Sequence, residues 1–110
     1  MKELEFIGTS LDDLRDFPKE TRQEIGWELD RLQAGKEPLD FKPMKTVGAG
    51  VYEVRVKTDD GAFRAFYVAK FEEAVYVLHA FQKKTRQTAK HDIDIGQKRY
   101  KELINDRKNL

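Results

Sequence analysis

The sequence has 110 residues, of which 39% are hydrophobic and 37% are charged, and its formal net charge is +1 at pH 7. This length fits one compact domain, residues 1–110, and the small net charge excludes the highly charged, weakly hydrophobic composition of a disordered chain. The absence of cysteine excludes disulfides, cysteine-ligated zinc and a cysteine nucleophile.

The lack of cysteine and of long apolar runs predicts a cytoplasmic protein with no membrane partner. No apolar run approaches the ~20 residues of a transmembrane helix, and the N-terminus lacks the apolar segment of a signal peptide. Residues 1–40 carry 6 Lys and Arg against 11 Asp and Glu, whereas residues 83–110 carry 9 against 4. The two ends of the chain therefore favour different partners, unless both simply form solvated helix faces.

The first elements expected along the chain are a strand and a short helix. Residues 2–7 alternate apolar and charged side chains, which predicts a half-buried strand. Ser10 is expected to cap a helix over residues 11–17, because its hydroxyl can accept from the free N–H groups of the first turn. Pro18 is expected to end this helix, since proline disfavours helical geometry in the residue before it.

A second helix is predicted over residues 19–34, ended by Gly35 as a left-handed cap. Its apolar stripe follows helical spacing and consists of Ile25, Leu29 and Leu32. Trp27 lies off that stripe and is expected at the edge of the core. The two helices together predict a helical hairpin.

Residues 36–50 contain two prolines and two glycines and are expected to form a loop. Three strands of an antiparallel meander are predicted after it, over residues 51–58, 63–71 and 74–82, with tight turns between them. The first of these strands alternates, and the other two are almost continuously apolar, which is typical of central strands covered on both faces.

The chain is expected to end in a helix over residues 89–105 that follows a polar, basic connector. Thr88 is the expected cap of this helix, and residues 107–110 are expected to fray. The whole order predicts an α+β domain with an N-terminal strand, a helical hairpin, a three-stranded antiparallel meander and a C-terminal helix.

Sequence motifs of common enzymes are missing from the chain. It has no P-loop, dinucleotide-binding, zinc-protease or serine-hydrolase motif. His79 and His91 have no third ligand at metal spacing, so we expect no metal and no cofactor. Most carboxylates lie on predicted helices or turns, where we expect them to be exposed to solvent.

The alternation of the strands places several basic residues on one face of the meander, and others follow in the connector after the last strand. Cations on an open sheet face are suited to bind a phosphodiester backbone, and aromatic rings beside them can stack on unpaired bases. The basic residues are Arg55, Lys57, Arg64, Lys83, Lys84 and Arg86, and the aromatic residues are Tyr67 and Phe81.

Such a groove could support RNA cleavage by attack of the 2′-OH on its own phosphate. This reaction needs a base, positive charge on the pentacoordinate phosphate and an acid for the leaving oxygen. Arg64 and Lys84 suit the charge requirement, and His91, in the first turn of the last helix, suits a proton transfer.

Purely structural roles are open for the same side chains. Arg64 could instead pair with Asp59 or Glu53 across the hairpin, and His79 could be a hydrogen-bonded core histidine. The two aromatic rings could belong to the core, and residues 83–86 could be no more than a soluble loop.

Residues 51–104 resemble the phage-derived, HigB-like branch of the RelE/ParE toxin superfamily. The resemblance is carried by YEVR (Tyr52–Arg55), FRAFYVAKF around Arg64, VLHAFQKKT (Val77–Thr85) and the DI…G…KR…Y pattern of the last helix. The helical hairpin and the order of the elements agree with it.

The resemblance implies the toxin of a type II toxin–antitoxin system: a metal-independent endoribonuclease that cleaves mRNA on the ribosome and forms a complex with a helix-turn-helix antitoxin. It implies phosphate binding by Arg55 and Arg64, a basic position at Lys83 and Lys84, and a catalytic position near His91. Two departures are that Glu53 replaces the first basic residue of the strand and that Tyr100 lies too far along the last helix to act at its start. The alternatives are a non-enzymatic, ParE-like inhibitor of DNA gyrase and an inactive antitoxin-binding module.

Overall fold

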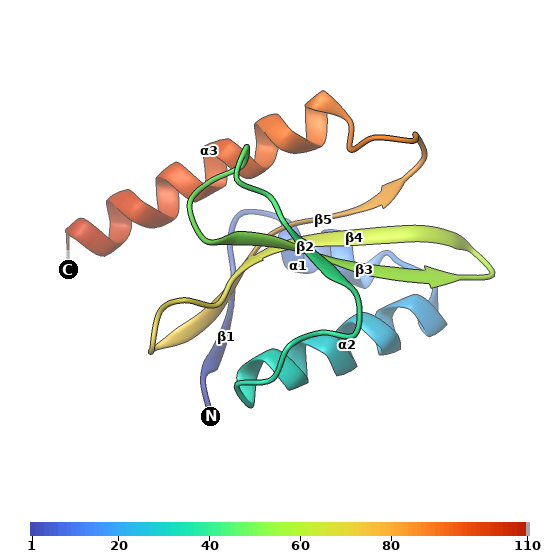
Figure 1. Ribbon diagram of the computed structural model, residues 1–110, viewed down its shortest axis with the longest axis horizontal. Coiled ribbons are helices and arrows are strands. Elements are labelled where there is room, and N and C mark those ends of the chain that lie inside the picture. The colour runs from blue at the N-terminus through green and yellow to red at the C-terminus, as the bar shows by residue number, and fades with distance from the viewer. Residues whose placement is uncertain (110) are drawn as a thin grey trace.

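A computed structural model describes residues 1–109, and in this part of the chain it shows an α+β arrangement of one mixed sheet and three helices (Figure 1). The predicted fold class is confirmed at this level. The elements are β1 (Glu3–Phe6), α1 (Ser10–Arg15), α2 (Lys19–Gln33), β2 (Phe41–Pro43), β3 (Val51–Thr58), β4 (Gly61–Val68), β5 (Ala74–Lys83) and α3 (Lys90–Lys108).

The sheet has the strand order β1-β5-β4-β3-β2. The predicted meander of β3, β4 and β5 is confirmed as antiparallel, and β1 adds to it parallel to β5. The expectation of a loop throughout residues 36–50 is wrong, because β2 pairs antiparallel with β3 there and places Lys42 opposite Glu53. Only three residues long and ending in Pro43, β2 is too short to show a periodic pattern, and proline is tolerated because this is the edge strand.

Helices cover both faces of the sheet, with α1 and α2 on one face and α3 on the other (Figure 1). The core on the first face joins Leu14 of α1 and Ile25 of α2 to the inward side chains of the strands. The core on the second face joins Leu103 of α3 to Phe66, among others. The sheet therefore has an "α1/α2 face" and an "α3 face", and α3 covers only part of the latter.

Both predicted N-caps are wrong, because tertiary neighbours take the two hydroxyl groups. Ser10 lies inside the first turn of α1, where its buried Oγ donates to the carbonyl oxygen of Val77 at 3.0 Å, and Thr9 occupies the N-cap position. Ala89 occupies the N-cap position of α3, and Thr88 donates instead to the side chain of Glu53. Gly35 is confirmed as a left-handed residue after α2, with φ of +80°.

Two further expectations change at the surface. Trp27 is 50% exposed rather than packed at the core edge, and the guanidinium of Arg31 lies 5.0 Å from the centre of its ring. The last helix continues to Lys108 because Arg107 pairs with Glu73 and lies 3.5 Å over the ring of Phe71. The predicted fraying is therefore wrong for residues 107 and 108, and Leu110 lies outside the described residues. None of the helices within residues 1–109 combines the length and the apolar character needed to cross a bilayer.

Candidate nucleic-acid interface

A charged cluster occupies the part of the α3 face that α3 leaves uncovered. Alternation along β3 sends Val54 and Val56 into the core on the α1/α2 face, so Glu53 and Arg55 point to the other side. Arg55 pairs directly with Arg64 in the β3–β4 register. Two arginines and one glutamate thus meet on neighbouring strands.

Glu53 is the centre of this cluster. Its side chain has 0% exposure, and its Oε1 lies 3.4 Å from Arg64 Nε and 3.8 Å from Arg55 Nε. Its Oε2 accepts a hydrogen bond of 3.1 Å from the hydroxyl of Thr88, in the connector before α3. A buried carboxylate held between cations orients their guanidinium groups, so Glu53 organises the cationic surface.

The pairing of Arg64 with Glu53, one of the two structural alternatives for this residue, is therefore what the structure shows. Arg64 is 9% exposed, and one of its Nη atoms also donates to the carbonyl oxygen of Phe63 at 3.0 Å. Burial lowers the pKa of Arg64 from its usual value, Glu53 opposes that shift, and the charge of Arg55 adds to it. The guanidinium group is charged at neutral pH nevertheless.

Lys42 and Lys83 extend the cluster on both sides. Lys42 is the cross-strand partner of Glu53 on β2, and Lys83 ends β5 opposite Ala62. Burial lowers the pKa of the Lys83 ammonium, and the nearby charges of Arg64, Arg55 and Lys42 lower it further. Cations that lower one another's pKa repel each other, and a bound anion would relieve that repulsion.

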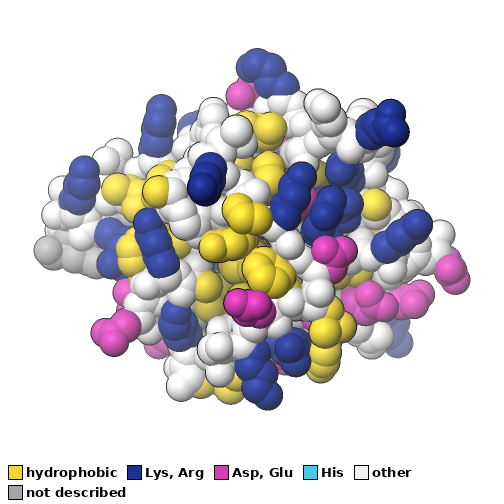
Figure 2. All heavy atoms as spheres, in the orientation of Figure 1, with side chains coloured by type: hydrophobic (Ala, Val, Ile, Leu, Met, Phe, Trp, Pro, Cys, Tyr) yellow, Lys and Arg dark blue, Asp and Glu magenta, His cyan; other side chains and the backbone are white. Residues whose placement is uncertain are grey.

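The other predicted cations surround this cluster at the surface. Lys57 is exposed on the same face of β3, and Lys84 and Arg86 are exposed on the connector between β5 and α3. Figure 2 shows a close group of Lys and Arg side chains on the side of the molecule that carries the β3–β4 hairpin, with other Lys and Arg side chains spread over the rest of this view. We call the set formed by Lys42, Arg55, Lys57, Arg64, Lys83, Lys84 and Arg86 the cationic face.

The structure does not bring the predicted aromatic platforms to the cationic face as open rings. Tyr67 is buried on the α1/α2 face, where its ring stacks on Tyr52 with 5.9 Å between centroids, and burial raises its pKa. Its assignment to the cationic face is wrong, because residues three apart in a strand, such as Arg64 and Tyr67, point to opposite faces. Phe81 does face Arg64 across the β4–β5 register, but it is buried against Phe66 and His79.

His91 lies away from the cluster. It is exposed and lines a shallow pocket between α1 and α3, together with Asp13, Asp16 and Arg99. The reason is helical geometry: Gly96 and Leu103 are the buried residues of α3, and they set the side of the helix that faces the sheet. His91 thus points towards α1 instead of towards Glu53.

His79 is a buried, hydrogen-bonded histidine, as one of the alternatives anticipated. Its Nε2 lies 2.8 Å from Asp92 Oδ1, so Nε2 donates and the ring links β5 to the first turn of α3. Its Nδ1 has no hydrogen-bond partner within residues 1–109. Burial lowers the pKa of His79, and the bond to Asp92 opposes that shift. The described residues also contain no group of three or more His, Asp or Glu side chains arranged to hold a metal ion.

Sequence reasoning misses one member of the site, Lys42, and assigns other roles to two more, Thr88 and Glu53. Lys42 lies in a segment that is expected to be a loop, and no repeating pattern around it marks it as part of a strand. Thr88 was read as a helix cap. Glu53 counts in the sequence only as a missing cation, and the single sign that it lies among cations is its place in the strand alternation, two residues before Arg55.

One comparison with known proteins matches most of the chain. Residues 12–101 match the family described as Phage derived protein Gp49-like (DUF891). No curated protein shows significant similarity to the chain. The matched residues include β2, β3, β4, β5 and the connector after β5, and therefore the whole cationic face.

Proposed function

The chain belongs to the family of phage-derived Gp49-like proteins, a toxin-like family related to the RelE and HigB toxins, and on this premise we propose that it is the toxin of a type II toxin–antitoxin system that cleaves mRNA on the ribosome. Its proposed site of action is the cytoplasm, and its proposed partner is a helix-turn-helix antitoxin, with which it forms a hetero-oligomer.

The observation that carries the proposal is the arrangement of Arg55 and Arg64 around the buried carboxylate of Glu53. Held in place before any ligand arrives, the two guanidinium groups are ready to bind a phosphate without losing much side-chain freedom. Lys42 and Lys83 add positive charge on either side. This geometry suits a single RNA strand that lies across β3, β4 and β5 and continues along the connector with Lys84 and Arg86.

The proposed reaction is attack of a 2′-OH on the adjacent phosphate. The 2′-oxygen loses its proton and forms a bond to phosphorus, the bond to the 5′-oxygen breaks, and that oxygen takes up a proton. Arg64 is proposed to stabilise the charge on the pentacoordinate phosphate. Lys84, which is exposed on the connector beside the cationic face, is proposed for a proton transfer. His91 lines a different pocket, away from Glu53, so no step of this reaction is assigned to it.

Growth and transcript integrity test this proposal. Expression of the chain alone is expected to arrest growth and to cut transcripts within reading frames, and Arg64→Ala is expected to abolish both. Arg64→Ala also removes the partner of the buried Glu53 and could disturb the fold. The less buried Arg55→Gln is therefore a second variant, and circular dichroism checks that each variant is folded. Lys101→Gln, an exposed change on α3, is the control and should stay toxic.

The outcomes separate the alternatives. A folded, fully toxic Arg64→Ala protein would contradict the proposed site. Growth arrest with intact transcripts and DNA damage would instead indicate a gyrase inhibitor, and the lack of any growth effect would indicate an inactive antitoxin-binding module.

A further inference from the structure

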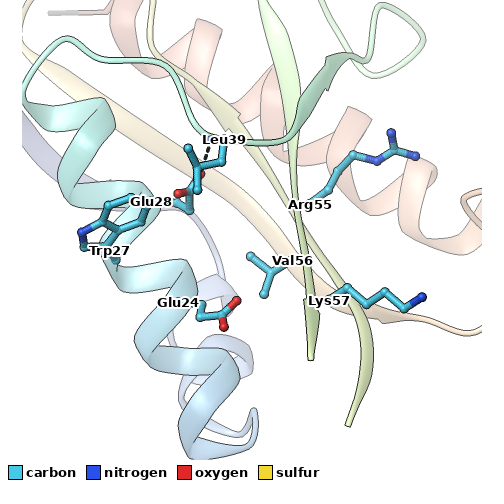
Figure 3. A pocket seen from close by; sticks show the side chains of 7 residues that line it. All are labelled: Glu24, Trp27, Glu28, Leu39, Arg55, Val56 and Lys57. Atoms are coloured by element: carbon cyan, nitrogen blue, oxygen red, sulfur yellow. Dashed lines mark hydrogen bonds between the residues drawn. The ribbon is translucent and has the colours of Figure 1, made fainter. Parts of the chain in front are cut away.

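A second surface lies on the opposite side of β3, in the groove between α2 and the strand (Figure 3). Glu24 and Glu28 of α2 and Val56 of β3 turn towards this groove, and Leu39 comes over it from the connection after α2. Arg55 and Lys57 stand at its rim but point away from it, towards the cationic face (Figure 3). Two carboxylates therefore dominate the charge inside the groove.

Two large apolar side chains are exposed along this groove. Trp27 is 50% exposed and Leu39 is 76% exposed, and both belong to its lining. Apart from Met1, they are the exposed large hydrophobic residues of the described chain. Scattered apolar residues need no explanation, but Leu39 over the groove and Trp27 at its outer rim on α2 (Figure 3) together provide the apolar contact on which protein recognition depends.

Glu28 gives an independent indication that the groove binds a hydrogen-bond donor. Its side chain is 5% exposed, and its Oε2 accepts a hydrogen bond of 2.7 Å from the backbone N–H of Leu39. Its Oε1 is buried and has no hydrogen-bond partner in residues 1–109. A buried carboxylate oxygen without a donor is costly, so an ammonium or guanidinium group delivered to it would be strongly favoured.

We propose that this groove docks a segment of a partner protein: an amphipathic helix whose apolar stripe is flanked by Lys or Arg. Its apolar side chains cover Trp27 and Leu39, and a basic side chain supplies the missing donor to Glu28 and pairs with Glu24. An acidic helix would leave the Glu28 oxygen without a donor and would be repelled by both carboxylates. The inference does not depend on RNA cleavage, because it uses no property of the cationic face; the two surfaces meet at Arg55 and Lys57, on the rim of the groove.

Trp27 makes the test direct, since it is the single tryptophan of the sequence. The probe is a synthetic amphipathic peptide of about 18 residues, long enough to form a helix, with Leu on one face and Arg beside it. Its addition to the full chain is expected to shift the Trp27 emission to the blue and to saturate. A peptide with Glu in place of every Arg should give no shift.

Variants of the groove locate the binding. Glu24→Gln and Leu39→Ala change exposed side chains and should keep the fold, and each is expected to weaken binding of the Arg peptide about tenfold. Glu28→Gln keeps an acceptor for the Leu39 N–H but removes the charge, and the same loss is expected. Glu102→Gln on α3 makes the same chemical change at an exposed site elsewhere and should bind as the unchanged protein does.

Three results would overturn the proposal. The first is equal binding of the Arg and Glu peptides, and the second is binding that Glu24→Gln and Leu39→Ala leave unchanged. The third is self-association of the chain, seen by sedimentation, that Leu39→Ala abolishes while no peptide shifts the emission; the groove would then bind a second copy.

Discussion

Glu53 of β3 and Arg64 of β4 are diagonal neighbours on adjacent strands, with 3.4 Å between the carboxylate Oε1 and the guanidinium Nε and with no exposed surface on the carboxylate. The pair sits where an RNA phosphate is proposed to bind. Because this pair is buried, the side chains of the cationic face are held in place from within the sheet. The charges of that face and the stability of the protein therefore depend on each other.

Removal of the Glu53 charge is therefore expected to destabilise the protein. Glu53→Gln keeps the shape of the side chain but leaves the nearly buried Arg64 without its counter-charge, so the free energy of unfolding should fall by about 3 kcal/mol. Urea unfolding measures the change. Asp40→Asn removes the other carboxylate near Arg55, but that side chain is 64% exposed, and the loss should stay below about 1 kcal/mol. Equal losses in the two variants would show that Glu53 does not organise the cluster.

Lys42 is expected to contribute to RNA binding although its sequence context gave no sign of it. Lys42→Gln should lower the affinity for a single-stranded RNA oligonucleotide and reduce the slope of log K against log salt by about 0.7, the value for one phosphate contact. Fluorescence anisotropy at several salt concentrations measures the slope. Lys101→Gln, which removes an exposed lysine on α3, should leave it unchanged. The same slope in all three proteins would exclude Lys42 from the interface.

Acidification is expected to weaken the fold through His79. Burial lowers the pKa of His79 below its value in the unfolded chain, about 6.5. Above that pH the ring is neutral in both states. As the pH falls below it, the unfolded chain takes up the proton first, so the free energy of unfolding decreases until the pH reaches the lowered pKa of the folded state.

The measurement is the urea midpoint between about pH 7 and pH 5. His79→Gln should flatten the profile in that range, because it removes the titrating ring. His91→Gln removes an exposed imidazole and should keep the slope of the unchanged protein. A slope that His79→Gln leaves in place would assign the pH dependence to other groups.

Two glycines on different helices are expected to respond oppositely to alanine. A Cβ at Gly96 would lie 2.8 Å from Phe66 and 2.9 Å from Val47, so Gly96→Ala should push α3 from the sheet and cost about 1–3 kcal/mol. A Cβ at Gly26 meets nothing within 4 Å, so Gly26→Ala in α2 should stabilise the protein by about 0.5–1 kcal/mol through its helix propensity. Thermal unfolding of both variants checks the signs, and stabilisation by Gly96→Ala would show that α3 is not packed this closely.

Local pattern was enough to predict the elements whose signals repeat. The alternation predicts β3 with its observed bounds, and the apolar stripe with Gly35 predicts the end of α2 to within one residue. These predictions succeeded because a side chain's direction in a long strand or helix follows from its spacing along the chain.

Tertiary structure alone decided which groups meet. The hydroxyls of Ser10 and Thr88, each a suitable helix cap by sequence, bond instead to Val77 and Glu53, because folding brings those acceptors within reach. β2 forms because β3 offers it an edge, and that pairing is what sets Lys42 beside Glu53. Composition and local spacing are enough to predict strands, helices and a basic second half of the chain. Which cations surround the buried carboxylate, and that His91 is not among them, depends on contacts between residues far apart in the chain, for which spacing carries no information.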